Sequence, residues 1–301
     1  MPGIALAHTV PIRPTPGVPP YGPGWAPAKT PLGQLRDALG RVALARIYRR
    51  DALPALNRAR ATLGLAPLRS AFGQLDRAAR VLVLVGAAFD FPARRAPANL
   101  GHVGTPMEDA GAAPPWTPPW PPGEALQPLV LVGLSTLPQG QEELMRRCLA
   151  AAGALDGVRV LVTLGPALDP ARFAVAPNVR LERFVPHSAV LPGAAAIVTQ
   201  CGIGTVTKAL LHGVPLVCVP LLGDQPDNAA RVVARGAGLR LPGDAPPARI
   251  AAAVRRVLAE PGFRRGAARL GAALTAEGPA ARRAADEIEA VLGPAGLAGA
   301  P

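Results

Sequence analysis

The second half of the chain alternates between short apolar runs and segments in which apolar residues have helical spacing. The runs predict buried strands at residues 129–134, 158–164, 179–184, 194–199 and 214–219. The helical spacing predicts helices at residues 139–152, 205–212, 226–234 and from Pro247 onwards. Near-continuous apolar strands separated by helices predict an α/β fold with a parallel, doubly wound sheet.

The first half of the chain has a different pattern of apolar and polar residues. Residues 1–31 contain a short apolar run and then a Pro- and Gly-rich stretch that predicts a loop. Apolar residues at three- and four-residue spacing, among them Leu35, Leu39 and Ile47, predict helix from 32 to about 65. A β-branched run at 81–85 predicts one further buried strand.

A Pro-rich stretch divides the two halves. Residues 104–128 contain eight prolines with Trp116 and Trp120, a composition typical of a linker. The sequence thus predicts four segments. They are an incomplete N-terminal domain at 1–105, a linker at 106–126, a complete Rossmann-like domain at 127–292 and a tail at 293–301.

Composition narrows the class of protein. Half of the 301 residues are hydrophobic, which excludes a wholly disordered chain. No apolar run is long enough for a membrane span, and the prolines after Met1 do not suit a signal peptide. The three cysteines, Cys148, Cys201 and Cys218, are too few and too widely spaced for a disulfide framework or a zinc cluster. We expect a reducing, cytoplasmic setting.

The net charge of +12 raises the question of nucleic acid. Lys29 and Lys208 are the only lysines, and the arginines occur mostly as pairs within helical patterns. Aromatic residues make up only 4% of the chain, so platforms for stacking bases are scarce. The charge therefore indicates solvated helix faces, and we expect no nucleic-acid partner.

One turn has the composition of an anion site. The predicted strand 194–199 runs into Gln200-Cys201-Gly202-Ile203-Gly204-Thr205 and then directly into a helix. Such a turn exposes backbone N–H groups and the positive end of the helix dipole, which suits a diphosphate. The alternative is a tight turn in which glycine merely relieves crowding, and the third glycine of the dinucleotide fingerprint is absent.

A second turn follows one strand later, with Asp224 and Gln225 ahead of a helix. A carboxylate and an amide at this edge of the sheet would suit the vicinal hydroxyls of a sugar. The alternative is helix capping, with Pro226 at the first helical position. Together, the two turns favour a ligand with a phosphate end and a polyol end.

Residues 127–292 resemble the nucleotide-sugar-binding half of the UDP-glycosyltransferase family, especially its bacterial members that glycosylate macrolides and other natural products. Four stretches carry the resemblance, in matching order and spacing: 184–187 (FVPH), 200–205 (QCGIGT), 213–215 (GVP) and 224–229 (DQPDNA). The resemblance implies a two-domain GT-B fold. It also implies an inverting, metal-independent enzyme without a cofactor.

The resemblance also implies roles for single residues. Ser135, Thr136, Gly202, Gly204 and Thr205 would contact the phosphates of the donor. At the other end, Phe184 would stack on the base, where the family usually has tryptophan. His187 would lie near the base or ribose, and Asp224 and Gln225 would hold the sugar hydroxyls. The final helix, near 280–292, would cross back to the other domain.

The chain departs from the family pattern in two places. Gln200 stands where the family has a histidine on the donor phosphate; an amide still donates a hydrogen bond but carries no charge. Two full Rossmann-like domains need roughly 350–400 residues. Residues 1–105 resemble only the later part of the acceptor domain, so the loop bearing the family's catalytic histidine is expected to be missing. His8, which ends an apolar run, is the nearest candidate base, although the context favours a bystander.

The resemblance predicts transfer of a hexose from a UDP- or dTDP-sugar to a hydroxyl of a small, largely apolar natural product. Two alternatives stay open: a non-catalytic nucleotide-sugar-binding or helper protein, or inactive homologue, and a nucleotide-sugar epimerase on the same fold. An incomplete acceptor domain would also expose sheet edge and apolar surface, which predicts self-association.

Overall fold

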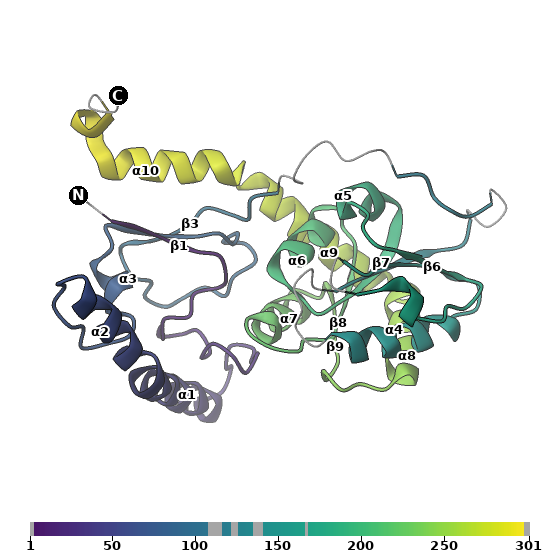
Figure 1. The fold of residues 1–301 in the computed structure, drawn as a ribbon, viewed down its shortest axis with the longest axis horizontal. Coiled ribbons are helices and arrows are strands. Elements are labelled where there is room, and N and C mark those ends of the chain that lie inside the picture. The colour runs from purple at the N-terminus through teal and green to yellow at the C-terminus, as the bar shows by residue number, and fades with distance from the viewer. Residues whose placement is uncertain (1–2, 108–115, 122–125, 135–140, 166–167, 298–301) are drawn as a thin grey trace. The chain divides into compact units, whose positions relative to one another are not determined.

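The computed structural model of the chain describes residues 3–107, 116–121, 126–134, 141–165 and 168–297. They form two compact units (Figure 1). The N-terminal unit combines residues 1–106 with 277–301, and the C-terminal unit spans residues 107–276.

The C-terminal unit is built on a six-stranded sheet in which every neighbouring pair is parallel. In spatial order its strands are β6 (Val179–Glu182), β5 (Arg159–Thr163), β4 (Leu129–Gly133), β7 (Ala194–Thr199), β8 (Leu216–Cys218) and β9 (Gly238–Arg240). Counted within the unit this is the order 3-2-1-4-5-6, that of the doubly wound Rossmann sheet. The predicted fold of this half is confirmed. β9 was not predicted, because three residues without an apolar run give no strand signal.

Helices cover both faces of this sheet (Figure 1). They are α4 (Glu142–Gly153), α5 (His187–Val190), α6 (Ile203–Leu211), α7 (Gln225–Ala234), α8 (Pro247–Ala259) and α9 (Pro261–Ala276). α4 and α8 bury an apolar cluster against one face, with Ile250, Val254 and Val257 in it as their spacing predicts. α6 and α9 pack closely, because Gly271 of α9 has no Cβ. A Cβ at this position would overlap the carbonyl oxygen of Leu210 in α6.

The N-terminal unit has a smaller parallel sheet, in the order β1 (Ile4–Ala7), β2 (Arg80–Val83), β3 (Leu100–His102). Its helices are α1 (Pro31–Asp51), α2 (Leu53–Thr62), α3 (Gly73–Arg77) and α10 (Ala280–Leu297). The predicted helical segment and strand 81–85 are therefore present. Gly101 and His102 form part of β3, which was not predicted, since the strand is held by β2 rather than by apolar residues of its own.

α10 packs with the N-terminal unit, so the predicted boundary at 292 differs from the observed one. The Arg80 guanidinium makes two hydrogen bonds, of 2.6 and 2.7 Å, to the carboxylate of Glu287 on α10. Arg283 donates to the carbonyl oxygen of His102, and Glu277 accepts from the backbone N–H of Ala88. These polar contacts explain why the last helix leaves the Rossmann-like unit, as the family resemblance implied.

The Pro-rich segment is not simply a linker. Trp120 is 7% exposed and belongs to the C-terminal unit. The guanidinium carbons of Arg159 and Arg180 lie 5.3 and 5.9 Å from the centroid of its ring. Cation–π contacts and burial anchor this tryptophan, so this part of the predicted linker packs within the C-terminal unit.

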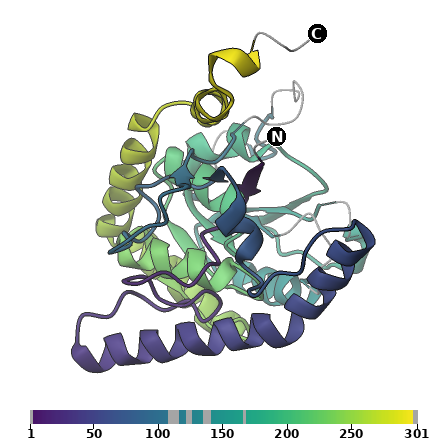
Figure 2. The same ribbon diagram turned by 90° about the vertical axis from the view of Figure 1, so that its left-hand side faces the viewer.

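α1 turns its apolar stripe to solvent. Leu32 is 78% exposed and Leu39 61%, and the same face carries exposed Leu35, Val42 and Ile47. Figure 2 shows this helix at full length, as the long purple ribbon. The packed side is formed instead by small and polar residues: a Cβ on Gly40 would meet the rings of Pro20 and Trp25. In the described part of the chain, no helix is long and apolar enough to cross a membrane.

This stripe supports the prediction of self-association. We expect Leu39→Glu to lower the mean molar mass of the purified chain in light scattering, because the new carboxylate interrupts an exposed apolar surface. The charge-matched control is Ala45→Glu, which alters an exposed position of the same helix without removing apolar bulk. A monomeric wild-type chain at high concentration would contradict the prediction.

Candidate functional site

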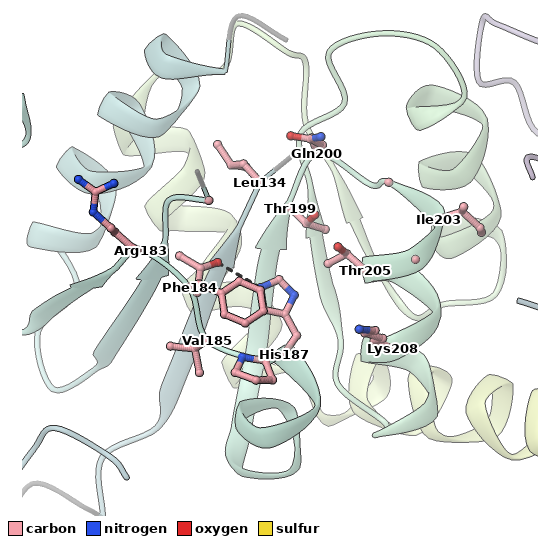
Figure 3. A pocket seen from close by; sticks show the side chains of 15 residues that line it. Leu134, Arg183, Phe184, Val185, His187, Thr199, Gln200, Ile203, Thr205 and Lys208 are labelled. Atoms are coloured by element: carbon pink, nitrogen blue, oxygen red, sulfur yellow. Dashed lines mark hydrogen bonds between the residues drawn. The ribbon is translucent and has the colours of Figure 1, made fainter. Parts of the chain in front are cut away.

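The carboxyl ends of the central strands of the C-terminal unit border a cavity of about 350 Å³. Its walls come from the segments after β4, β5, β6 and β7 and from the first turns of α6 (Figure 3). Strand order reverses between β4 and β7, and such a switch point is where open α/β sheets bind ligands. Leu134, which follows β4, and Gln200, which follows β7, line the cavity on either side of that point.

The start of α6 opens into this cavity. Gly202 precedes the helix, and its carbonyl oxygen accepts the first intrahelical bond, from the N–H of Val206. The N–H groups of the first turn therefore have no intrahelical acceptor, and among the described residues no side chain caps this end. Gly204 has open space where a Cβ would be, and Thr205 adds a hydroxyl to the cavity wall. The turn predicted as an anion site has the geometry of one.

The loop before α6 is held rigidly. Gln200 is 4% exposed and lines the cavity. Thr199 Oγ1 accepts a hydrogen bond of 3.3 Å from the N–H of Cys201. Asn228 Nδ2, from α7, donates to the carbonyl oxygen of Cys201 at 2.9 Å. The orientation of the first turn is thus fixed by two neighbouring elements before any ligand arrives.

Cys201 adopts a backbone conformation that favours glycine. Its φ is +70°, the only positive value for a described residue other than glycine. The side chain is fully buried, and burial raises the pKa of the thiol well above its usual value. Cys201 is therefore a core thiol. The left-handed backbone was not foreseen, because sequence spacing carries no information on φ at this position.

We predict that Cys201→Gly is more stable to urea than Cys201→Ala by about 1 kcal/mol, because only alanine keeps the cost of a left-handed backbone. Both variants remove the same sulfur atom, so their difference reflects the left-handed backbone together with the Cβ that only alanine keeps. Equal stability of the two, measured by far-UV circular dichroism, would mean that the turn relaxes away from positive φ.

The opposite end of the cavity offers an aromatic face. Phe184, just after β6, is 71% exposed and lines the cavity. His187 begins α5; its Nε2 lies 3.1 Å from Thr163 Oγ1, the contact drawn in Figure 3. The imidazole lies over Gly133, where a Cβ would be 2.6 Å from His187 Cε1. An exposed ring beside a positioned imidazole suits a planar, polar group such as a nucleobase.

Two cations line the cavity that sequence reasoning did not select, Arg183 and Lys208. None of the described residues lining it is acidic. The charged side chains among these lining residues are therefore cationic, which suits an anion. The signal for Lys208 was its place three residues after Thr205 on the same helix face.

The other predicted donor residues divide into two groups. Asp224 and Gln225 are not among the lining residues of the cavity. Gln225 Oε1 accepts from the N–H groups of Leu221 and Leu222 at 2.8 and 3.1 Å, and Asp224 Oδ2 accepts from Asn228 Nδ2 at 2.9 Å. Asp224 is the N-cap residue of α7, as in the alternative interpretation, but its side chain makes no capping hydrogen bond. Their contact with a sugar stays a prediction. Ser135 and Thr136 lie outside the described residues.

The histidines of the N-terminal unit lie elsewhere. His8 is exposed and lines an apolar cavity of about 190 Å³ beside β1. His102 Nε2 lies 2.8 Å from the buried carboxylate of Asp90, but His102 does not line that cavity. Within the described residues, no three His, Cys, Asp or Glu side chains gather as a metal ion would need.

Comparison with known proteins agrees with this geometry. Residues 146–291 match the family model described as "Erythromycin biosynthesis protein CIII-like, C-terminal domain". The chain is 37% identical over 257 residues to 4'-demethylrebeccamycin synthase of Lentzea aerocolonigenes. This alignment covers 83% of this chain and 60% of the relative. It is 34% identical over 179 residues to demethyllactenocin mycarosyltransferase of Streptomyces fradiae. That alignment covers 58% of this chain and 38% of the relative.

Among solved structures, the calicheamicin glycosyltransferase CalG4 aligns with all of this chain and 69% of its own, at a TM-score of 0.68 and 26% identity. The chain is similar to natural-product glycosyltransferases and shares the GT-B fold of these structures. The glycosyltransferase of kitacinnamycin is similar too, with a TM-score of 0.67, 27% identity, and coverage of 86% of this chain and 65% of that one.

The chain spans about three fifths of the length of the first curated relative. The family match, at 146–291, covers the segment that holds α6 and the cavity, together with most of α10. The similarity to this family model therefore lies chiefly in the C-terminal unit.

Proposed function

We propose that the cavity of the C-terminal unit binds the nucleoside diphosphate of a UDP- or dTDP-sugar, as the donor site for transfer of a hexose. The observation that carries this proposal is the uncapped first turn of α6, which faces a cavity with cationic side chains in its wall, at the switch point of the sheet. The acceptor would be a hydroxyl of a small, largely apolar natural product. This class of acceptor rests on the names of the relatives alone.

The proposed site would serve the leaving group. When the sugar–phosphate bond breaks, negative charge grows on the departing diphosphate. The N–H groups of the first turn and the buried amide of Gln200 would donate hydrogen bonds to that charge, in an orientation fixed before the reaction. In the proposed inverting reaction, a base removes the acceptor proton while its oxygen attacks the anomeric carbon. The proposal assigns no residue as that base.

Neither a cofactor nor a metal ion enters the proposed reaction. In other sugar transfers a divalent cation offsets the phosphate charge. Here the helix dipole and the cationic side chains of the cavity would offset it instead. Activity in the presence of EDTA tests this part directly.

One observation favours a second candidate, a nucleotide-sugar-binding protein without transfer: Gln200 cannot carry the charge of the histidine that it replaces. Analysis of the products, together with a measurement of donor binding, separates the possibilities. The purified chain is incubated with UDP- and dTDP-hexoses and EDTA, with and without a panel of hydroxylated polycyclic and macrolactone acceptors, and the products are followed by mass spectrometry.

A glycosylated acceptor supports the transferase. Donor binding with no product supports the binding protein, and conversion of the donor without an acceptor identifies an epimerase. Absence of both binding and turnover in a folded chain contradicts the proposed site.

A further inference from the structure

The fold fixes α1 with its apolar stripe facing solvent. On the opposite side of the helix, the buried carboxylate of Asp37 accepts hydrogen bonds from the N–H of Ala28, at 3.3 Å, and from the guanidinium of Arg36, at 2.6 Å. One turn later, Arg41 donates to the carbonyl oxygen of Val18 at 3.0 Å. These contacts hold the polar side of the helix against the N-terminal unit, so the exposure of the stripe follows from the fold.

The stripe is continuous along the helix. Leu32, Leu35, Leu39 and Val42 follow one another at three- and four-residue spacing, and all three leucines are more than half exposed. Arg46 continues the same line four residues after Val42. The helix rises about 21 Å between Leu32 and Arg46. A contiguous apolar surface of this kind on a folded chain indicates an interaction site.

The charges around the stripe are mostly positive. Residues 29–60 contain eight cationic residues and two acidic ones. Each of the two acids already pairs with the arginine before it, at 2.6 Å in both cases. Lys29, Arg46 and Arg49 are exposed, and none of the three has an ion-pair partner among the described residues. Both ends of this helix therefore carry positive charge that the chain does not balance.

This charge determines which partner fits the stripe. A second copy would bring the same cations to the contact and leave them unbalanced. An anionic lipid surface offers acyl chains to the leucines and headgroup phosphates to the cations. Arginine suits the boundary between the two, because its aliphatic stem lies along apolar surface while its guanidinium stays among the headgroups.

We propose that α1 is a membrane-docking helix, which lies in the surface of an anionic lipid bilayer. Leu32, Leu35 and Leu39 enter the acyl boundary, and Arg46 and Arg49 contact headgroup phosphates. The proposal is independent of the donor site, because it concerns the N-terminal unit alone. The self-association predicted above is what the same stripe does when no lipid is present.

The test measures co-sedimentation of the full chain with lipid vesicles at low ionic strength. Vesicles of phosphatidylcholine alone are compared with vesicles of equal parts phosphatidylcholine and phosphatidylglycerol. The wild type is expected to bind the mixed vesicles about a hundredfold more tightly, because each of three cations near an anionic surface adds about fivefold. Added salt should weaken this binding.

Matched variants assign the binding to α1. Arg46→Gln is expected to weaken binding to the mixed vesicles about fivefold. Arg269→Gln, which removes an exposed cation from the C-terminal unit, should change it little. Leu39→Gln is expected to weaken binding at least about tenfold, because an apolar side chain leaves the acyl boundary. Its control is Ala45→Gln, at an exposed position outside the stripe. Far-UV circular dichroism checks that each variant is folded.

Three outcomes overturn the proposal. Equal losses in Arg46→Gln and Arg269→Gln would mean that the net charge of the whole chain attracts the vesicles. Equal binding to both kinds of vesicle would remove the role of the cations. If the folded chain binds neither kind, while Leu39→Glu lowers its molar mass in solution, the occupant of the stripe is a second copy.

Discussion

Alanine in place of Gly271 is expected to destabilise the C-terminal unit by about 3 kcal/mol. A Cβ at this position would lie 2.0 Å from the carbonyl oxygen of Leu210 and 2.9 Å from its carbon. Both are backbone atoms of α6, which no change of rotamer can move. α9 must therefore shift away from α6.

The same helix provides the control. Gly262 lies in the first turn of α9 and has open space where a Cβ would be. Gly262→Ala should be neutral or stabilising by up to about 1 kcal/mol, because alanine favours helix over glycine. Urea denaturation followed by circular dichroism measures both variants. Similar midpoints for Gly271→Ala and Gly262→Ala would contradict the close packing of α6 on α9.

Aspartate in place of Gly204 is expected to weaken binding of UDP or dTDP by about a hundredfold, since like charges placed together cost several kcal/mol. Position 204 is in the first turn of α6 and has open space for a side chain. A carboxylate there occupies the place proposed for the phosphate. The same carboxylate should stabilise the helix by about 0.3–1 kcal/mol, because it faces the positive end of the dipole.

Stability and binding thus move in opposite directions, which a general loss of fold cannot imitate. Gly204→Ala fills the same space without charge and should retain most of the binding. Calorimetry gives the affinities, and thermal unfolding gives the stabilities. If Gly204→Asp binds UDP and dTDP as well as Gly204→Ala does, the phosphate does not lie at this turn.

The sequence predicted the C-terminal sheet because its strands are apolar on both faces. β4, β5, β7 and β8 lie within one or two residues of their predicted bounds. The turn at 200–205 was recognised because a strand, two glycines and a helix follow one another without a gap. β9 and α9 were missed: one has no apolar run, and the other begins directly after α8 at Pro261.

Other features depend on tertiary contacts that sequence spacing does not encode. The apolar stripe of α1 has the spacing of a core-facing helix, yet it is exposed. The opposite side of α1 packs at Gly40 against the loop around Trp25. Trp120 lies in a stretch with the composition of a linker, but two arginines bury it. Lys208 belongs to no sequence motif, and its place in the cavity wall is known only from the structure.

The central claim is that the first turn of α6 holds the phosphates of a nucleotide. The most direct test follows the backbone amide resonances of the isotope-labelled chain during titration with UDP and dTDP in the presence of EDTA. The account predicts that the largest shifts fall on Gly202, Ile203, Gly204 and Thr205, with smaller shifts at Phe184. Shifts confined to the N-terminal unit, or none in a folded chain, would contradict it.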